Sequence, residues 1–467
     1  MKKWIKVLCA ITSVGLNSVL FADDISQYFQ NKAAAVQLPE AHIALKSKNY
    51  SKAFDIYKKL AETGTGQIVA QYQLGYLYLN GWGTDKDPAL AAAWWMKAGS
   101  SGLPQAQVAL GTLYYYGVGI EQGLAQAITL YTQAANNTNN PLAEYMLGYL
   151  SENGIGTEKN PQTAANWYTK AASQGIAQAQ YNLGLLYYKG LGVPKDFSKA
   201  FTWFNLAAQQ GLPKAQFMLG VMFSTVQADK NQAFSWYTQA AQKGLAEAEY
   251  NLGVMYYNGF GTPPNLNTAL SWIKKATDQG LPRAQYVTGY LLYNGVGYTK
   301  DVTQALLWYQ KAAAQNCIDA EFALGFLYYK GLGVLKDDRQ AFAWLLLAAK
   351  QGLANAQYMV GLFFQQGMGV PSDPKAAANW YTLAAQQGMD NAQLLLGVMY
   401  SQGQGIPRDN RTAYAWLNLA STSSNPQIRE SALKMRDELA KRMTPADIGT
   451  AKQMSQSYYS KYAPPGT

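Results

Sequence analysis

The chain has 467 residues, of which 49% are hydrophobic, 13% aromatic and only 14% charged, and its formal net charge is +10. This content of apolar and aromatic side chains excludes a largely disordered protein, and the length exceeds what one ordinary hydrophobic core serves. The basic residues are spread along the chain, so the charge does not indicate a surface for nucleic acid.

The N-terminal residues 1–22 read MKKWIKVLCAITSVGLNSVLFA. Lys2, Lys3 and Lys6 precede an apolar stretch that ends at Ala22, which predicts a secretory signal peptide cleaved after Ala22. The alternative is a retained membrane anchor, for which the apolar stretch is short. No later segment is apolar enough to cross a bilayer, so we expect no membrane span after cleavage.

Residues 65–420 repeat one unit ten times, at intervals of 33 to 37 residues. We align the copies on a glycine that usually follows Leu, and in each copy an Ala lies five residues before it. The alignment glycines are Gly75, Gly111, Gly148, Gly184, Gly220, Gly253, Gly289, Gly325, Gly361 and Gly397. A regular period of this length is typical of a helical array in which each unit buries its apolar face against its neighbours.

Each unit predicts two helices. The first runs from the Ala to a Tyr-rich end, where a G-x-G sequence supplies the positive φ that ends it. The second begins twelve residues after the alignment glycine, mostly at an Asp or Asn that caps free amide groups. We expect its Trp, nineteen residues after the glycine in most copies, to lie in the core, together with the Tyr three residues after the glycine.

The pattern A-x-x-x-L-G-x-x-Y-x-x-G-x-G…D…A-x-x-W-[YF]-x-x-A-A-x-x-G resembles the Sel1-like repeat, a relative of the tetratricopeptide repeat. The resemblance implies an all-α, right-handed superhelical solenoid of about ten helix–turn–helix repeats with terminal capping helices. It further implies the secreted Gram-negative type, a periplasmic or secreted location, and a role in envelope processes or host contact and virulence. The enzymatic activities linked to disulfide-stapled members of the family are not implied, because paired cysteines are absent.

Two segments flank the array. Within the N-terminal segment, residues 23–64, the stretch NYSKAFDIYKKLAETG resembles the second helix of an incomplete starting repeat, with Ile56 in the Trp position. Residues 421–467 predict C-terminal capping helices and a tail, and Thr444 with Asp447 forms a capping box for the last helix. The alternative is that this helix leaves the array to bind a partner.

The sequence offers little for catalysis. After signal cleavage one cysteine, Cys317, and one histidine, His42, remain, and neither has an evident catalytic partner. The regular Asp and Asn residues serve as helix caps. We therefore expect a protein that is not an enzyme and that has no cofactor and no metal site.

One face of the first helix is the predicted binding site. Positions −6, −3, +1 and +4 from the glycine share this face, which lines the concave groove in the related tetratricopeptide repeats. Position −3 is mostly aromatic, and the charge at −6 changes from copy to copy. The candidate residues are Tyr181, Tyr188, Lys214, Phe217, Glu247, Tyr250, Tyr257, Arg283, Tyr286 and Tyr293. The alternative is that the −3 aromatics only pack neighbouring repeats.

These features predict a non-enzymatic scaffold or adaptor that binds a protein or peptide in the groove. The alternative function is binding of envelope glycan, such as peptidoglycan, on the same Tyr-lined face. The sequence does not name the partner or give the oligomeric state.

Overall fold

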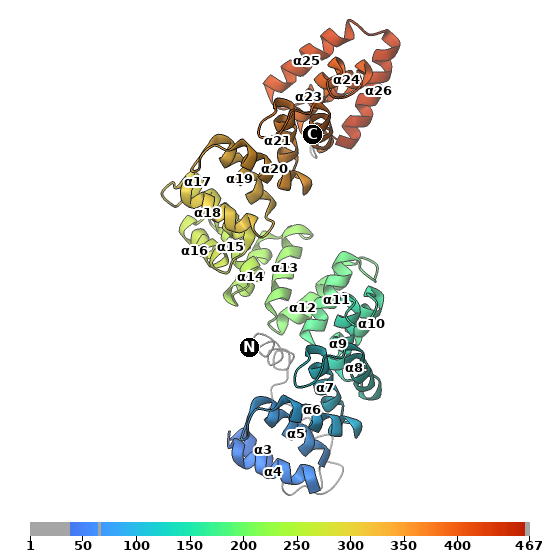
Figure 1. Cartoon of the computed structure of the whole chain (residues 1–467), viewed down its shortest axis with the longest axis vertical. Coiled ribbons are helices and arrows are strands. Elements are labelled where there is room, and N and C mark those ends of the chain that lie inside the picture. The colour runs from blue at the N-terminus through green and yellow to red at the C-terminus, as the bar shows by residue number, and fades with distance from the viewer. Residues whose placement is uncertain (1–37, 64–66, 463–467) are drawn as a thin grey trace. The chain divides into compact units, whose positions relative to one another are not determined.

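The computed structural model describes residues 38–63 and 67–462, and this part of the chain contains 24 α-helices and no strand. Two compact units divide it, one ending at Lys243 and one beginning at Gly244. Figure 1 shows the helices of each unit in chain order. The predicted signal peptide at residues 1–22 lies outside the described residues.

In the first unit the helices are α3 (Leu38–Lys46), α4 (Tyr50–Thr63), α5 (Gln67–Asn80), α6 (Pro88–Ser100), α7 (Pro104–Tyr116), α8 (Leu124–Thr138), α9 (Pro141–Asn153), α10 (Pro161–Ser173), α11 (Ala177–Lys189), α12 (Phe197–Gln209), α13 (Pro213–Thr225) and α14 (Lys230–Gln242). In the second unit they are α15 (Ala246–Asn258), α16 (Leu266–Asp278), α17 (Pro282–Asn294), α18 (Val302–Ala313), α19 (Ile318–Lys330), α20 (Asp338–Lys350), α21 (Ala354–Gln366), α22 (Pro374–Gln386), α23 (Asp390–Gln402), α24 (Asn410–Ala420), α25 (Pro426–Ala440) and α26 (Pro445–Tyr462).

The odd-numbered helices α5 to α23, here the A helices, each pair with the next helix, here the B helix. Each pair is one repeat, and we number the pairs 1 to 10. Within each unit every B helix also packs against the A helix that follows it, so the apolar faces are buried between repeats. The predicted all-α array of helix–turn–helix repeats is confirmed.

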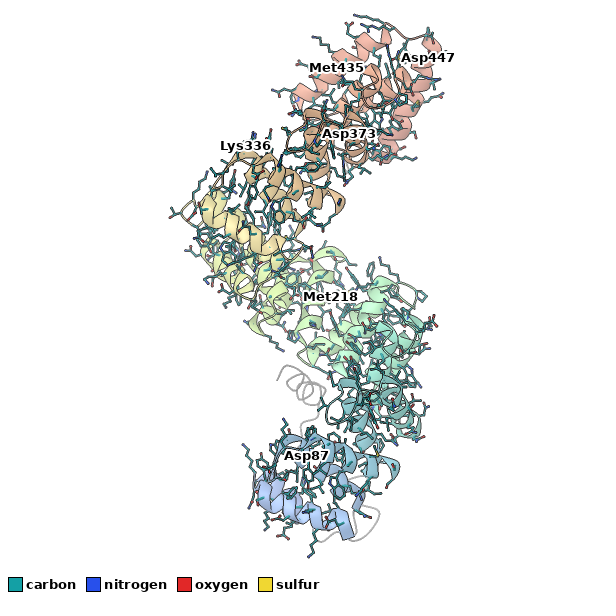
Figure 2. All side chains as sticks on the ribbon, viewed as in Figure 1. Asp87, Met218, Lys336, Asp373, Met435 and Asp447 are labelled. Atoms are coloured by element: carbon teal, nitrogen blue, oxygen red, sulfur yellow. The ribbon has the colours of Figure 1, made fainter. Side chains whose placement is uncertain are left out.

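The predicted helix boundaries are confirmed. Asp87 accepts hydrogen bonds from the backbone N–H groups of Ala89 and Leu90 at 2.9 and 3.0 Å, and Asp373 caps α22 in the same way. Figure 2 labels both aspartates where the loops enter their B helices. At the other boundary, every A helix except α13 ends at a glycine in the left-handed region, such as Gly190 with φ of +71°. The local sequence therefore sets both ends of the helices.

The alignment glycine is in close contact with one side chain of the B helix, which leaves no room for a Cβ. A Cβ placed on Gly184 would lie 2.7 Å from ring carbons of Phe204, on the B helix of the same repeat. The same position faces Trp95 in repeat 1, Tyr168 in repeat 3 and Leu345 in repeat 8. This residue, twenty positions after the glycine, is fully buried in all four of these repeats. The glycine allows the B helix to approach the A helix closely, as its small size predicts.

The prediction that the Trp series lies in the core is wrong for most repeats. Trp203 is half-buried, whereas its neighbour Phe204 is completely buried. Each half-buried Trp lies beside the packed core instead of within it. In repeats 1, 3, 6 and 7 a Lys three residues further on places its Nζ 3.8–4.4 Å from the centre of the Trp ring. The Tyr three residues after the glycine is also half-buried, as at Tyr187.

A buried row of side chains four residues before the alignment glycine links successive repeats. In most repeats where this residue is Gln, its Nε2 donates to a backbone carbonyl at the end of the preceding helix, as Gln357 does to Ala349 at 3.2 Å. Its Oε1 accepts from a Gln of the following turn, Gln387, at 2.8 Å. Repeat 8 has Glu321 in this place, and Gln351 donates to its Oε2 at 2.7 Å. A carboxylate cannot donate to the carbonyl, so this repeat lacks the hydrogen bond to the end of the preceding B helix.

The last two helices cover the end of the array. α26 packs along α24, and Tyr458 and Tyr462 place their rings 4.5 and 5.8 Å from that of Trp416. Trp416 is only 4% exposed, because α26 covers the face that is open in the internal repeats. The Thr444 hydroxyl accepts from the Asp447 backbone N–H at 3.1 Å, which confirms the predicted start of α26.

Candidate binding face of the A helices

The predicted binding residues differ in exposure according to their position. Three residues at −6 are exposed, namely Lys214, Glu247 and Arg283, and four aromatics at −3 are half-buried, namely Tyr181, Phe217, Tyr250 and Tyr286. At +4, Tyr257 is 44% exposed, whereas Tyr188 and Tyr293 are half-buried. The face therefore combines accessible charges with aromatic rings that show one side to solvent.

The inner edge of the −3 rings is used in packing. Tyr181 lies 5.9 Å from Phe204 between ring centres, and Tyr286 lies 5.7 Å from Tyr309. Both partners are the buried residues that face the alignment glycine, so the −3 ring extends the core of its own repeat. Packing accounts for part of each ring, and the exposed remainder is available for contact.

In the second unit, candidate residues of successive repeats act on one another. Burial raises the pKa of the Tyr250 hydroxyl, the Arg283 guanidinium lowers it, and Asp319 raises it. Burial and Asp319 raise the pKa of Tyr286 as well. Tyr250, Arg283 and Asp319 belong to repeats 6, 7 and 8, so the structure brings the −6 and −3 positions of three repeats into one electrostatic neighbourhood. We call these residues, with Tyr286, the mixed-charge cluster.

Tyr290 is a member of the same face that the sequence-based candidates do not include. It occupies position +1 of repeat 7, is 49% exposed, and acts on the pKa of Tyr286. Most other repeats carry an aliphatic residue at +1, so the repeat pattern does not single this position out. Its place on the helical wheel, beside −3 and +4, is the signal that identifies it.

The first-unit candidates are less closely grouped. The Tyr188 ring lies 5.4 Å from that of Phe197 at the start of α12, so it packs against its own repeat. Lys214 is exposed and makes no hydrogen bond or ion pair with another described residue. Phe217 lies 5.6 Å from Tyr237. The structure does not place these residues in one cluster comparable to that of the second unit.

A second group of aromatics lies on α7 and α9, and of these Tyr145 at −3 and Tyr115 at +4 belong to the predicted face. Tyr115 and Tyr116 are in edge contact with ring centres 4.7 Å apart, and burial, followed by the nearby Tyr149, raises the pKa of the Tyr115 hydroxyl. Burial, then Tyr149 and Glu152, raise the pKa of Tyr145 to about 12. All five side chains are partly accessible. We call Tyr115, Tyr116, Tyr145, Tyr149 and Glu152 the tyrosine cluster.

The described residues offer no metal centre, since no three His, Cys, Asp or Glu side chains among them are placed to hold an ion. Cys317 is a free, half-buried thiol at the start of α19, and burial raises its pKa. A thiol with a raised pKa is a poor nucleophile at neutral pH. Within residues 38–63 and 67–462, no helix is long and apolar enough to cross a membrane.

A family model of the Sel1 repeat matches eleven segments of this sequence. They are residues 45–64, 68–103, 104–139, 141–176, 177–212, 213–245, 246–281, 282–317, 318–353, 354–389 and 390–425. The chain belongs to the Sel1 repeat family. The short first match covers α4 and agrees with the expected incomplete starting repeat. Sel1 repeat proteins are generally scaffolds for protein interaction and typically non-catalytic.

One solved structure agrees with this assignment, and a second is similar over part of the chain. A protective antigen present in uropathogenic Escherichia coli strains, described as displaying an SLR fold, is 31% identical, with a TM-score of 0.75 and coverage of 95% of each chain. A Sel1 repeat protein from Oxalobacter formigenes is 30% identical over 58% of this chain and 97% of its own, with a TM-score of 0.40. No curated protein matches the sequence significantly.

Proposed function

We propose that this Sel1 repeat protein is an exported, non-enzymatic scaffold that binds a protein or peptide along the exposed face of its A helices. The mixed-charge cluster carries the proposal. Tyrosine rings supply apolar area and hydroxyl hydrogen bonds at small entropic cost, and the neighbouring Arg283 and Asp319 supply opposite charges. A partner segment with complementary charges would be held in one register along successive repeats.

Export and host contact are part of the same proposal. The signal-like residues 1–22 support export to the periplasm or beyond. The similar E. coli protein, a protective antigen present in uropathogenic strains, supports a role in the bacterial envelope or in host interaction and virulence. Detection of the protein in periplasmic and culture-supernatant fractions, beside a cytoplasmic marker, tests the location directly.

Site-specific crosslinking tests the binding face. A photoreactive phenylalanine at Tyr257 or Tyr290, which are 44% and 49% exposed, is expected to capture the same protein in cells. The matched control is Leu347, which is 45% exposed but lies on the B helix α20. Arg283→Glu should abolish capture from both tyrosine positions. Capture that is equal from Leu347, or that survives Arg283→Glu, would contradict the proposed face.

The tyrosine cluster favours a second candidate function, the binding of envelope glycan such as peptidoglycan. Its rings offer faces for sugar stacking, and its hydroxyls and Glu152 offer hydrogen bonds to sugar hydroxyls. Purified murein sacculi should then retain the protein, and Tyr116→Ala with Tyr149→Ala should release it. Tyr257→Ala is the control, because Tyr257 lies in the other unit. Retention that is unchanged by the double substitution would exclude the cluster as a glycan site.

A further inference from the structure

The loops between A and B helices cover one another from repeat to repeat. In most repeats, the second glycine of the G-x-G sequence lies against the preceding B helix of the same unit. At Gly405, with φ of +73°, an added Cβ would overlap the backbone of Pro374, the first residue of α22. Gly369 has the same relation to Asp338, the first residue of α20. The start of most internal B helices is thus covered by the loop of the next repeat.

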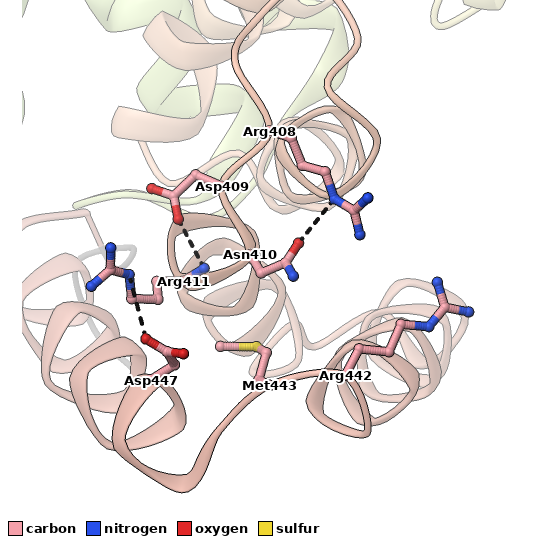
Figure 3. A pocket seen from close by; sticks show the side chains of 7 residues that line it. All are labelled: Arg408, Asp409, Asn410, Arg411, Arg442, Met443 and Asp447. Carbon is pink, nitrogen blue, oxygen red and sulfur yellow. Dashed lines mark hydrogen bonds and ion pairs between the residues drawn. The ribbon is translucent and has the colours of Figure 1, made fainter.

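The start of the last B helix, α24, is not closed in this way, because no further repeat follows. The turn between α25 and α26 lies there instead and leaves a cavity of about 330 Å³. Figure 3 shows Arg408 before α24, Asn410 at its first position, and Arg442 with Met443 from the turn. A cavity of this size is within the range of small-molecule sites.

The acidic side chains of the cavity are occupied by local contacts. Asp409 accepts from the backbone N–H of Arg411 at 2.9 Å and from the Thr412 hydroxyl at 2.7 Å. Asp447 accepts from the Thr444 hydroxyl at 2.8 Å and pairs with Arg411, whose Nε is 3.8 Å away. These hydrogen bonds and the ion pair engage both carboxylates within the protein, and Arg411 points away from Arg408, as Figure 3 shows.

Two guanidinium groups, those of Arg408 and Arg442, therefore form no ion pair with a carboxylate of the cavity lining. The Arg408 side chain donates only a long Nε hydrogen bond of 3.3 Å to Asn410 Oδ1, and the Arg442 side chain makes no hydrogen bond or ion pair within residues 38–63 and 67–462. Glu438, the acid nearest to Arg442 in sequence, is paired with Lys441 at 2.6 Å. Arg408 and Arg442 extend to the same side of the cavity in Figure 3. The Asn410 amide N–H₂ adds a neutral donor to the lining of the cavity.

We infer that this cavity binds an anionic small molecule whose carboxylate or phosphate group lies between Arg408 and Arg442. Guanidinium groups donate paired hydrogen bonds to such oxyanions. Met443 offers an apolar surface for the remainder of the ligand. The site lies at the C-terminal end of the array and is separate from the proposed partner-binding face.

Calorimetric titration of the full chain with phenyl phosphate and with benzoate tests the inference. Both probes carry an apolar ring, and they differ in the anionic group. We expect saturable binding of at least one probe at low ionic strength. Arg408→Gln and Arg442→Gln should each weaken it about ten-fold, the effect of losing one charge-assisted hydrogen-bonding group. Stronger binding of phenyl phosphate assigns a phosphate ligand, and stronger binding of benzoate assigns a carboxylate.

Arg339→Gln is the matched control, since Arg339 occupies in repeat 8 the position that Arg411 occupies in repeat 10 and does not line the cavity. It changes the net charge equally and should leave binding unchanged. Unfolding midpoints of all three variants should equal that of the wild type, because none removes a buried contact. Absence of binding of both probes, or equal weakening by Arg339→Gln, would overturn the inference.

Discussion

Replacing the alignment glycine of repeat 4 with alanine tests how the repeats hold together. In Gly184→Ala the new Cβ would lie 2.7 Å from Cδ1 and Cε1 of Phe204, whereas ordinary contacts begin at 3.4 Å. The ring is completely buried among Ala200, Ala207 and Ala208, so it cannot withdraw without moving α12. Overpacking of this kind costs about 1–3 kcal/mol.

The substitution also carries a gain, because alanine is better than glycine in a helix by about 1 kcal/mol. Gly449→Ala isolates that gain, since Gly449 lies within α26 and an added Cβ there has no neighbour within 4 Å. We expect Gly449→Ala to be neutral or stabilising and Gly184→Ala to be destabilising. The difference between the two free energies of unfolding should be about 1–3 kcal/mol, because both share the helix-propensity gain.

Urea unfolding followed by far-UV circular dichroism measures both variants under the same conditions. Equal stabilisation by the two substitutions would refute the reasoning, because it would mean that the Phe204 ring does not restrict the space at Gly184.

Three further predictions concern the buried row, the core and the caps. Burial raises the pKa of Glu321 above its usual value, although Gln351 opposes this, so wild-type stability should increase as the pH falls from 7 towards the usual pKa. Glu321→Gln should raise the free energy of unfolding at pH 7 by about 1 kcal/mol through the missing hydrogen bond. The substitution should also reduce the pH dependence of stability. Urea unfolding midpoints at pH 7 and pH 5 check both effects. A variant no more stable than the wild type at pH 7 would contradict the expected gain from the missing hydrogen bond. Phe204→Ala should lower the free energy of unfolding by about 3–5 kcal/mol and Trp203→Ala by clearly less, since only Phe204 is fully buried. A larger loss of stability for Trp203→Ala in urea unfolding would indicate that the Trp is the core residue. Asp301→Ala should cost about 1 kcal/mol by removing the hydrogen bond from the Gln304 N–H, and an unchanged unfolding midpoint would argue against a capping role.

The binding face was predictable only in part. Helical periodicity alone places −6, −3, +1 and +4 on one side of an A helix, so the exposure of Lys214, Glu247 and Arg283 follows from it. Periodicity does not show which charges of different repeats meet, because that depends on how successive A helices pack. Periodicity already places Tyr290 at +1, Tyr115 at +4 and Tyr145 at −3 on this face, whereas the grouping of Tyr115 with Tyr149 of the next repeat depends on that packing.

The sequence by itself determined the repeat length, the number of full repeats and the ends of the helices. Each of these depends on contacts within a few residues, such as Asp301 with the N–H of Gln304 or Gly190 at the end of α11. Local chemistry is sufficient to specify them.

Only the tertiary structure decided what occupies the core. Positions nineteen and twenty after the glycine lie about 100° apart on the B helix, and both are aromatic in many repeats. The approach of the A helix, made possible by the glycine, selects the second position and leaves the Trp at the side. The end cavity arises in the same way, because its lining residues come from the last repeat and from the α25–α26 turn and meet only when α26 packs on α24.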